Sequence, residues 1–418
     1  MLSRWIPAAG RQRGLLARLG SRAYSHGRVF DAAARDGELR VFVVAGEVSG
    51  DSLASRLMAS LRKLSPVPVR FAGVGGELMC KEGLQSLFPM EEIAIMGLWE
   101  LLPHIYNVKR KIKDTLDAAI LFRPHAVVTV DSKGFSFRLL QQLKCRYNQK
   151  VDSPLHVHYV APSFWAWKGG ERRLSKLHNF VDHMLCILPF EDEICRLHGL
   201  PATYVGHPLL DDAAGLNVAG TSLQHKNVDS ELSPDMSMRQ RSGEAFRLEH
   251  GLSPVVLIPG GSLEKRYGAF NASKAALCTS GTAVMEVMLA KLPCVVAYQA
   301  HFLTECFIHL RKKINFISLP NILLDSPIVP EILFRACTDK NLAAKLSEVI
   351  FNDEVRQLQV GSAERMLQVL YEPIKRQGNL FAEELGDSGL SSDVYSPSTI
   401  AALTVLYTDK NRRMVHRN

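Results

Sequence analysis

The stretch from Val41 to Asp51, Val-Phe-Val-Val-Ala-Gly-Glu-Val-Ser-Gly-Asp, most narrowly limits the folds open to this chain. Four consecutive apolar residues before a glycine turn are typical of a parallel strand that is buried on both faces. An amphipathic segment follows from Leu53 to Leu64, with Asp51 and Ser52 as N-caps. This order predicts the first β-α unit of a doubly wound domain, which binds ligands at the carboxyl ends of its strands. The glycine spacing is not G-x-G-x-x-G, so a dinucleotide site is not supported.

The same pattern recurs along the chain. Apolar strands are expected to start at residues 41, 69, 126, 156, 184 and 202, and they alternate with helical segments. That alternation predicts a complete α/β domain. After a polar stretch, Pro254–Ser262 restarts the strand and glycine-loop pattern, which predicts a second Rossmann-like domain. The expected bounds are a transit peptide at 1–30, a first domain at 38–212, a polar linker or insertion at 213–250, a shortened second domain at 251–385, and a tail at 386–418 whose helix is free to cross back.

Charge is concentrated at the start of the chain. The first 30 residues contain six arginines and no acid, in a chain whose formal net charge is +8. An acid-poor, amphipathic, arginine-rich start is typical of a transit peptide, for the mitochondrion first and the plastid second. A disordered basic tail is the alternative. The remaining chain is nearly balanced, which argues against nucleic-acid binding, and no apolar run is long enough for a transmembrane helix.

The sequence allows two interpretations for several side chains. Asp131 follows a predicted buried strand, and it is either a catalytic carboxylate or a cap for its loop. His156 and His158 share a strand face, where packed core histidines are favoured over a metal pair because no third ligand is evident. The eight cysteines contain no C-x-x-C pair, which favours reduced, buried thiols. An apolar group followed by the cationic run Lys109–Lys113 is either a core helix or a membrane-interface helix: Leu98, Trp99, Leu101, Leu102 and Ile105.

The turn Ser280-Gly281-Thr282 stands between a predicted strand and a helix that carries Glu286. Backbone N–H groups at such a turn suit a diphosphate, and a carboxylate one turn along the helix suits ribose hydroxyls. The setting predicts a nucleotide site in the second domain.

Eight motifs occur in one order that resembles the lipid-A-disaccharide synthases, inverting glycosyltransferases with the two-domain glycosyltransferase-B fold. The motifs are Ala45–Asp51, Gly73–Gly76, Met96-Gly97, Tyr159–Trp167, Pro189–Glu191, Val205–Leu209, Ser280–Thr282 and Ser318–Asn321.

The resemblance implies transfer of 2,3-diacylglucosamine from UDP to 2,3-diacylglucosamine 1-phosphate, which gives the β-1,6 disaccharide phosphate and UDP. It implies Asp131 as the general base, no metal and no cofactor. It also implies peripheral membrane contact through Leu98, Trp99, Leu101, Leu102 and Ile105, and it leaves a homo-oligomer open. The implied acceptor-binding residues are Gly46, Glu47, Ser49, Gly50, Asp51, Gly75 and Gly76. The implied UDP-binding residues are Gly260, Ser280, Gly281, Thr282, Glu286 and Asn321.

The chain also departs from the family pattern. Pro259-Gly-Gly-Ser262 is followed by Leu263 where the family has a phosphate-binding arginine, which is absent here or displaced to Arg266. Phe334 replaces a family glutamine. Gly260 and Ser280 are too close in sequence for the β-α-β unit, of roughly 30 residues or more, that should separate them. We infer an internal deletion, and the alternative function is an impaired form that only binds acylated sugar phosphates or a partner.

Overall fold

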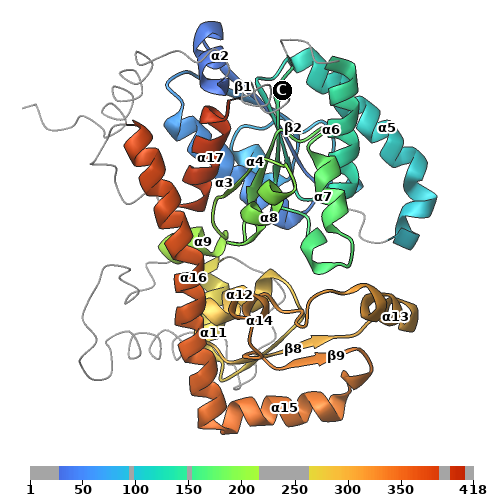
Figure 1. Cartoon of the computed structure of the whole chain (residues 1–418), viewed down its shortest axis with the longest axis vertical. Coiled ribbons are helices and arrows are strands. Elements are labelled where there is room, and N and C mark those ends of the chain that lie inside the picture. The colour runs from blue at the N-terminus through green and yellow to red at the C-terminus, as the bar shows by residue number, and fades with distance from the viewer. Residues whose placement is uncertain (1–27, 94–97, 148–152, 216–262, 386–395, 410–418) are drawn as a thin grey trace, which may run out of the picture. The chain divides into compact units, whose positions relative to one another are not determined.

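The computed structural model describes residues 28–93, 98–147, 153–215, 263–385 and 396–409 (Figure 1). The chain divides into two units. Unit 1 comprises Met1–Trp165, Gly169–Pro208 and Pro373–Asn418, and unit 2 comprises Ala166–Lys168 and Leu209–Glu372. The chain therefore returns to unit 1 at Pro373, earlier than the expected boundary at residue 385. The segment where a returning helix was expected, Pro373–Asn418, belongs to unit 1.

Unit 1 is built on a six-stranded parallel sheet in the order β2-β1-β3-β4-β5-β6. All six expected strands are present: β1 (Leu39–Ala45), β2 (Val69–Val74), β3 (Ala126–Val130), β4 (Leu155–Tyr159), β5 (His183–Cys186) and β6 (Ala202–Tyr204). β1 and β3 are neighbours with Ala45 opposite Val130, so their following loops start side by side. The strand order reverses at β1, where a doubly wound sheet opens a ligand site.

Helices cover both faces of this sheet. They are α2 (Val29–Asp36), α3 (Val48–Leu64), α4 (Glu77–Lys81), α5 (Leu98–Phe122), α6 (Lys133–Tyr147), α7 (Glu171–Leu177), α8 (Glu191–Leu197) and α17 (Pro397–Tyr407). Figure 1 shows α5 and α6 on one face and α3 with α17 on the other. The core therefore lies in two apolar layers, as the uninterrupted apolar strands predict.

The returning C-terminal segment is an integral part of unit 1. Helix α17 is apolar nearly all round and is buried from Ile400 to Leu406. Gly206, in the loop after β6, has a φ of +100°, and a Cβ there would lie 2.5 Å from Ile374 Cδ1 and 3.0 Å from Pro397 Cγ. The Val205–Leu209 motif is thus partly explained by packing against the C-terminal segment.

The bounds expected for a transit peptide, 1–30, overlap the first helix of the folded body. Helix α2 starts at Val29, which is 1% exposed, and the ring of Phe30 stacks on that of Tyr407 at 5.7 Å. Arg28 also forms an antiparallel bridge with Asp409. Residues from Arg28 onward belong to the folded body because an amphipathic helix that covers α17 cannot be removed without exposing apolar surface.

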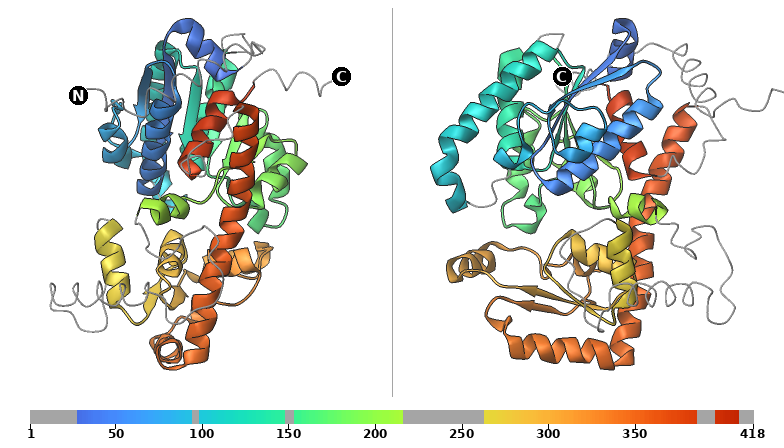
Figure 2. Two further views of the ribbon diagram at one scale, coloured as in Figure 1. Left: turned by 90° about the vertical axis from the view of Figure 1, so that its left-hand side faces the viewer. Right: turned by 180° about the vertical axis from the view of Figure 1, so that it is seen from behind.

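The described part of unit 2 is a smaller parallel α/β body with a three-stranded sheet in the order β7-β8-β9 (Figure 2). Its elements are α9 (Leu209–Gly215), α11 (Leu263–Ala272), β7 (Ala276–Cys278), α12 (Thr282–Leu289), β8 (Cys294–Tyr298), α13 (Phe302–Arg311), α14 (Leu319–Leu324), β9 (Glu331–Leu333), α15 (Asp339–Phe351) and the first part of α16 (Asp353–Leu385). The polar linker and the strand expected near Pro254 lie outside the described residues. The strand β9 was not expected, because three residues carry no readable periodicity.

The edge strand β7 is only partly covered. Leu277, at its centre, is 50% exposed, whereas Val295 and Val296 on the neighbouring β8 are fully buried. An exposed apolar edge strand is unusual in a natural sheet. Among the described residues, β7 is the edge of this sheet.

Candidate functional site

Asp131 is placed by the sheet at the carboxyl end of β3. Its backbone N–H donates to the carbonyl of Tyr159 at the end of β4, at 3.0 Å, and its carbonyl accepts from Ser136 Oγ at 2.8 Å. Burial raises the pKa of the Asp131 carboxyl, and the backbone N–H of Ser132 and the charge of Lys133 oppose that rise. A carboxylate with a raised pKa is a better proton acceptor than an exposed one.

The backbone around this carboxylate is strained. Asp131 and Ser132 have φ angles of +49° and +42°, and Val160, after β4, has a φ of +76°. Non-glycine residues rarely occupy this region, and a β-branched residue such as valine does so least of all. Such strain clusters at functional sites, where surrounding hydrogen bonds enforce it. Three strained residues at the ends of two neighbouring strands favour a functional role for Asp131 over a simple loop cap.

The first glycine loop packs directly against the Asp131 loop. A Cβ added to Gly46 would lie 2.6 Å from Ser132 Oγ, so only glycine fits there. The pKa of Glu47 is raised by burial and next by the negative charge of Asp131, while Lys133 lowers it. The structure thus brings Gly46, Glu47 and Asp131 together, as the sequence predicts for a ligand site at the strand ends. Ser49 is exposed in the first turn of α3.

Asp51 has a structural task that differs from the expected one. Helix α3 starts at Val48, not near Leu53, so Asp51 is not its N-cap. Its buried carboxylate accepts the backbone N–H groups of Gly76, Leu78 and Met79 at 2.9, 3.0 and 3.1 Å. A Cβ at Gly76 would lie 2.6 Å from Asp51 Oδ2. Asp51 therefore ties the two glycine loops together by capping α4, which satisfies N–H groups that a helix start leaves open.

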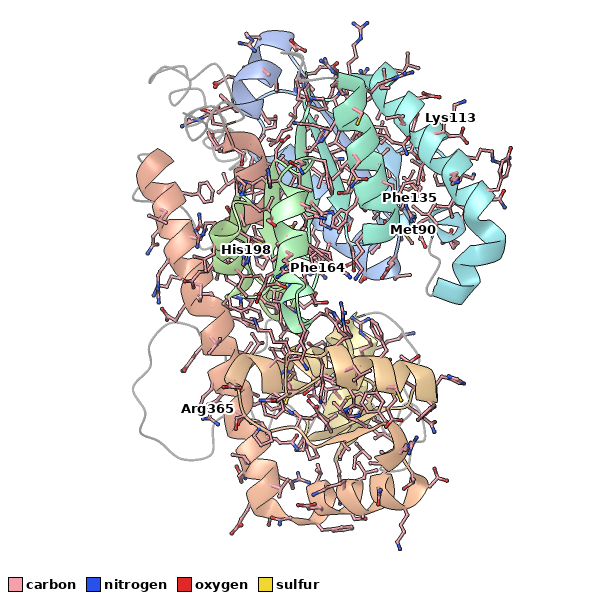
Figure 3. All side chains as sticks on the ribbon, turned by 45° about the vertical axis from the view of Figure 1, so that its right-hand side comes forward. Met90, Lys113, Phe135, Phe164, His198 and Arg365 are labelled. Atoms are coloured by element: carbon pink, nitrogen blue, oxygen red, sulfur yellow. The ribbon has the colours of Figure 1, made fainter. Side chains whose placement is uncertain are left out.

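Two aromatic side chains of the Tyr159–Trp167 motif lie close to the Asp131 loop, and two cations that were not predicted as site residues lie near one of them. Phe164 (labelled in Figure 3) lies in the 3-10 helix η2 (Phe164–Ala166). Lys133 Nζ and the Arg173 guanidinium lie 6.0 and 5.8 Å from the centre of its ring. Trp165 Nε1 donates to Glu191 at 3.0 Å, and burial raises the pKa of Glu191 to about 7. The aromatic motif from Tyr159 was a visible signal, but its cationic partners come from other elements.

The two strand histidines are core residues, as expected. His158 is 1% exposed, its Nδ1 lies 2.8 Å from Thr129 Oγ1, and burial lowers its pKa to about 3. His156 Nδ1 lies 3.0 Å from the carbonyl of Phe180. Among the described residues, no group of histidine, cysteine and carboxylate side chains has the arrangement of a metal site.

All eight cysteines are free thiols, and the expectation that they are buried is confirmed for Cys186, Cys195 and Cys294. Cys278, Cys306 and Cys337 are only partly buried. Cys80 and Cys145 are exposed because each lies on the outer side of a surface helix.

In unit 2 the turn Ser280–Thr282 leads from β7 into α12. Ser280 Oγ donates to the carbonyl of Ile317 at 3.1 Å, and Thr282 is exposed at the start of α12. Glu286, four residues on, is on the same side of the helix as Thr282. Arg266 Nε on α11 lies 3.2 Å from Glu286 Oε2. The turn, the carboxylate and a cation therefore meet at the beginning of α12.

The side chain of Asn321 forms hydrogen bonds within unit 2 and has a structural role there. Its side-chain amide donates to the carbonyl of Val329 at 2.8 Å and to Glu331 Oε1 at 3.0 Å. Its Oδ1 accepts the backbone N–H groups of Ile328 and Val329. Glu331 also accepts from the N–H groups of Ile317 and Ser318. Asn321 is 1% exposed, so it orders the loop that receives Ser280 rather than presenting its amide to solvent.

Some predicted site residues cannot be placed. Gly260 lies outside the described residues. The expected membrane-contact residues Leu98, Trp99, Leu101, Leu102 and Ile105 form the first turns of α5, but their side chains lie outside the described set. Further along α5, Lys113 is exposed (Figure 3). Within the described chain, no helix is both long and apolar enough to span a membrane.

A sequence profile of the family described as "Lipid-A-disaccharide synthetase" matches residues 41–232 and 261–385. A "Probable lipid-A-disaccharide synthase, mitochondrial" of Arabidopsis thaliana is 49% identical, over 90% of this chain and 93% of that protein. The lipid-A-disaccharide synthase of Rhodospirillum centenum is 36% identical, over 77% of this chain and 88% of that protein. A solved UDP-N-acetylglucosamine 2-epimerase superimposes with a TM-score of 0.45 and 11% identity, over 82% of this chain and 97% of the other.

The match to the Arabidopsis relative is longer than the part of this chain that it covers. The Arabidopsis match extends over 430 positions, yet 90% of the 418 residues of this chain is about 376 residues. About 54 positions of the match therefore have no counterpart in this chain. The family profile, in turn, is interrupted between residues 232 and 261.

Proposed function

The chain belongs to the family of lipid-A-disaccharide synthases, glycosyltransferases of lipid A biosynthesis, and from that membership we propose which residues carry its reaction. The transfer moves 2,3-diacylglucosamine from UDP to 2,3-diacylglucosamine 1-phosphate. The products are the β-1,6-linked disaccharide phosphate and UDP. The matches support this transferase, and none supports a protein that only binds acylated sugar phosphates.

The reaction needs one displacement and one proton acceptor. The acceptor's hydroxyl oxygen attacks the anomeric carbon, and the bond from that carbon to the UDP oxygen breaks with its electron pair leaving on UDP. In this proposal Asp131 takes the hydroxyl proton as the oxygen attacks. Proton transfer to a positioned carboxylate contributes about 10²–10⁴ in rate. A single displacement inverts the anomeric centre, so no covalent intermediate on the protein is required.

The observation that carries this role is the setting of Asp131. Burial raises the pKa of its carboxyl, and the backbone at Asp131 and Ser132 is strained. Glu47 and Lys133 add one negative and one positive charge beside it. We propose that Gly46, Glu47 and Lys133 line the acceptor side and that Asp51 and Gly76 only shape it.

For the donor, we propose that UDP binds at the start of α12. Backbone N–H groups at Gly281 and Thr282 suit the diphosphate, and Glu286 suits the ribose hydroxyls. Asn321 supports the neighbouring loop through Glu331 instead of touching UDP. The family has a phosphate-binding arginine directly after the segment that reads Pro259-Gly-Gly-Ser262 here, and this chain has Leu263 at that position. In this proposal Arg266 supplies the positive charge instead.

We also propose that the missing positions fall between residues 232 and 276. Two observations support this: the interruption of the family profile and the partly uncovered edge strand β7. The segment removed would then have supplied further strands beside β7.

Localisation follows from the chain's own start and from one relative. The arginine-rich, acid-poor residues before Arg28 and the mitochondrial name of the Arabidopsis relative support import into mitochondria. Acylated substrates lie in a bilayer, so we propose peripheral contact through the first turns of α5.

The test is a direct assay. Purified protein from Arg28 onward is mixed with the UDP-linked donor and the monosaccharide 1-phosphate acceptor, and UDP release and disaccharide formation are both followed. The expected result is matched release of UDP and disaccharide. UDP binding without disaccharide would contradict the transferase in this form of the chain.

A further inference from the structure

Helix α13 presents a broad apolar surface to solvent. Phe302, Phe307 and Leu310 are 52%, 57% and 72% exposed. At 3.6 residues per turn these three side chains lie within an arc of about 140° on one side of the helix. Large exposed side chains gathered on one side of a helix differ from the scattered apolar residues of an ordinary protein surface.

The same surface is strongly cationic. Arg311 and Lys313 are exposed at the end of α13, and the Arg335 guanidinium lies 4.9 Å from the ring centre of Phe302. From His301 to Ile314 the single acidic residue is Glu305. Its side chain is 15% exposed and lies 3.6 Å from Arg335 and 3.9 Å from His309. The exposed charge around the apolar side chains is therefore positive.

This surface is held rigidly. The ring of Trp167 lies 6.0 Å from that of Phe307. Lys168 N–H donates to the carbonyl of Arg311, and Lys313 N–H donates to the carbonyl of Ala166, both at 2.8 Å. These backbone bonds join the Ala166–Lys168 segment to the end of α13. The exposure is thus not that of a loosely attached helix.

Its place in unit 2 leaves the surface accessible within that unit. Figures 1 and 2 show α13 at one end of unit 2, away from α12 and α16. The described core of the sheet is instead completed by Val295, Ile332 and Val349, from β8, β9 and α15. The apolar side of α13 is therefore not part of that core.

We propose that the α13 surface, defined as Phe302, Phe307, Leu310, Arg311, Lys313 and Arg335 with Trp167, binds an anionic phospholipid bilayer. The apolar side chains enter the headgroup boundary, and the cations contact the phosphates. A helix with an apolar aromatic side and flanking Lys and Arg is the form that lies in a membrane interface. Each cation near an anionic leaflet adds to the attraction, which weakens with salt. The partner follows from the proposed function, because diacylated substrates reside in a bilayer.

Vesicle co-sedimentation tests this surface without any sugar transfer. Protein from Arg28 onward is mixed with vesicles of phosphatidylcholine alone or of phosphatidylcholine with phosphatidylglycerol. Binding is expected to the mixed vesicles and to fall with added salt. Phe307→Ser with Leu310→Ser is expected to weaken it at least about tenfold. Arg311→Gln with Lys313→Gln is expected to remove the preference for the anionic lipid.

Phe351→Ser is the matched control, because Phe351 is 82% exposed in the same unit at the end of α15. It should bind vesicles as the wild type does. Leu310→Ser alone serves if the double variant does not fold, since Leu310 is 72% exposed. Unchanged vesicle binding in the α13 variants would overturn the proposal. So would a fall in their molecular mass in solution with vesicle binding retained, because the surface would then be a contact between copies.

The outcomes separate this inference from the proposed transferase. If the wild type binds vesicles through α13 but releases no UDP, the transferase fails and the membrane surface stands. If detergent-dispersed substrates are converted but α13 variants bind vesicles normally, only the membrane surface fails.

Discussion

Arg266 Nε and Glu286 Oε2 lie 3.2 Å apart, which joins α11 to α12 beside the Ser280–Thr282 turn. The pair has two consequences for the proposed nucleotide site. It fixes the direction of the carboxylate that is proposed to meet the ribose, and it keeps a guanidinium beside the proposed diphosphate position. The two roles can be separated by changing the nucleotide.

We expect Glu286→Gln to lower the preference for UDP over 2′-deoxy-UDP about tenfold, because hydrogen bonds to a charged group are worth about 1.5–3 kcal/mol. Arg266→Gln should lower the same preference if it acts by orienting Glu286. It should instead lower the preference for UDP over uridine if it contacts the diphosphate. Calorimetric titration of the three ligands into each variant gives the answer. If the wild type and both variants have equal ligand preferences, neither Arg266 nor Glu286 contacts the nucleotide.

Asp131→Asn should reduce the turnover number by about 10²–10⁴ with little change in melting temperature, because it removes a proton acceptor and keeps the shape of the side chain. Since the pKa of Asp131 is raised by burial, the acid limb of the wild-type pH–rate profile should lie above the ordinary pKa of 3.8. Asp114→Asn, on the exposed side of α5, is the control. A turnover number within about twofold of the wild type would exclude the role of general base.

Asp51→Ala should lower the free energy of unfolding by about 3 kcal/mol or more, because it leaves three backbone N–H groups without their acceptor. Urea titration measures this change. Asp51→Asn should cost less, since an amide oxygen still accepts. If Asp51→Ala has the same urea midpoint of unfolding as the wild type but does not bind the acceptor, Asp51 is a ligand residue.

The buried carboxyl of Glu191 should make the free energy of unfolding depend on pH. Burial raises its folded pKa from 4.5 to about 7, so the folded state holds a proton that the unfolded state loses. The stabilisation from this proton is complete below pH 4.5 and is lost as the pH rises through about 7. The free energy of unfolding of the wild type should therefore fall by about 3 kcal/mol over this pH range, and that of Glu191→Gln should not. Urea titrations of both proteins at several pH values test it, and parallel curves would contradict it.

The boundary of the mature protein can be tested by truncation. A chain that starts at Arg28 should melt like the full chain. One that starts at Gly37 should lose at least about 2 kcal/mol, because Val29 and the Phe30–Tyr407 ring stack are removed. Chemical unfolding of both chains compares them. Sequencing the amino terminus of protein from isolated mitochondria should find a start at or before Arg28, and a later start would contradict this boundary.

The strands of unit 1 could be predicted from the sequence because they are continuous apolar runs, several of which end in glycine or aspartate. Asp131 was readable for the same reason, since a carboxylate directly after a buried parallel strand lies at the sheet edge where doubly wound domains bind ligands. The family resemblance came from motif order, and the matches confirm it. Strand β9 and the early start of α3 were not readable. A three-residue strand has no period, and Val48-Ser49-Gly50 does not look like the first turn of a helix.

The sequence alone therefore determined the α/β class, the family and the carboxylate at the end of β3, because these depend on local pattern and motif order. Only the tertiary structure decided what neighbouring polar residues do. Asp51 and Asn321 stand in ligand-like motifs, yet their side chains bind the protein's own backbone. Glu286 has an arginine partner that is 20 positions away in sequence. Whether a polar group faces a ligand or the chain itself depends on which distant backbone groups need a partner, and no sequence pattern carries that information.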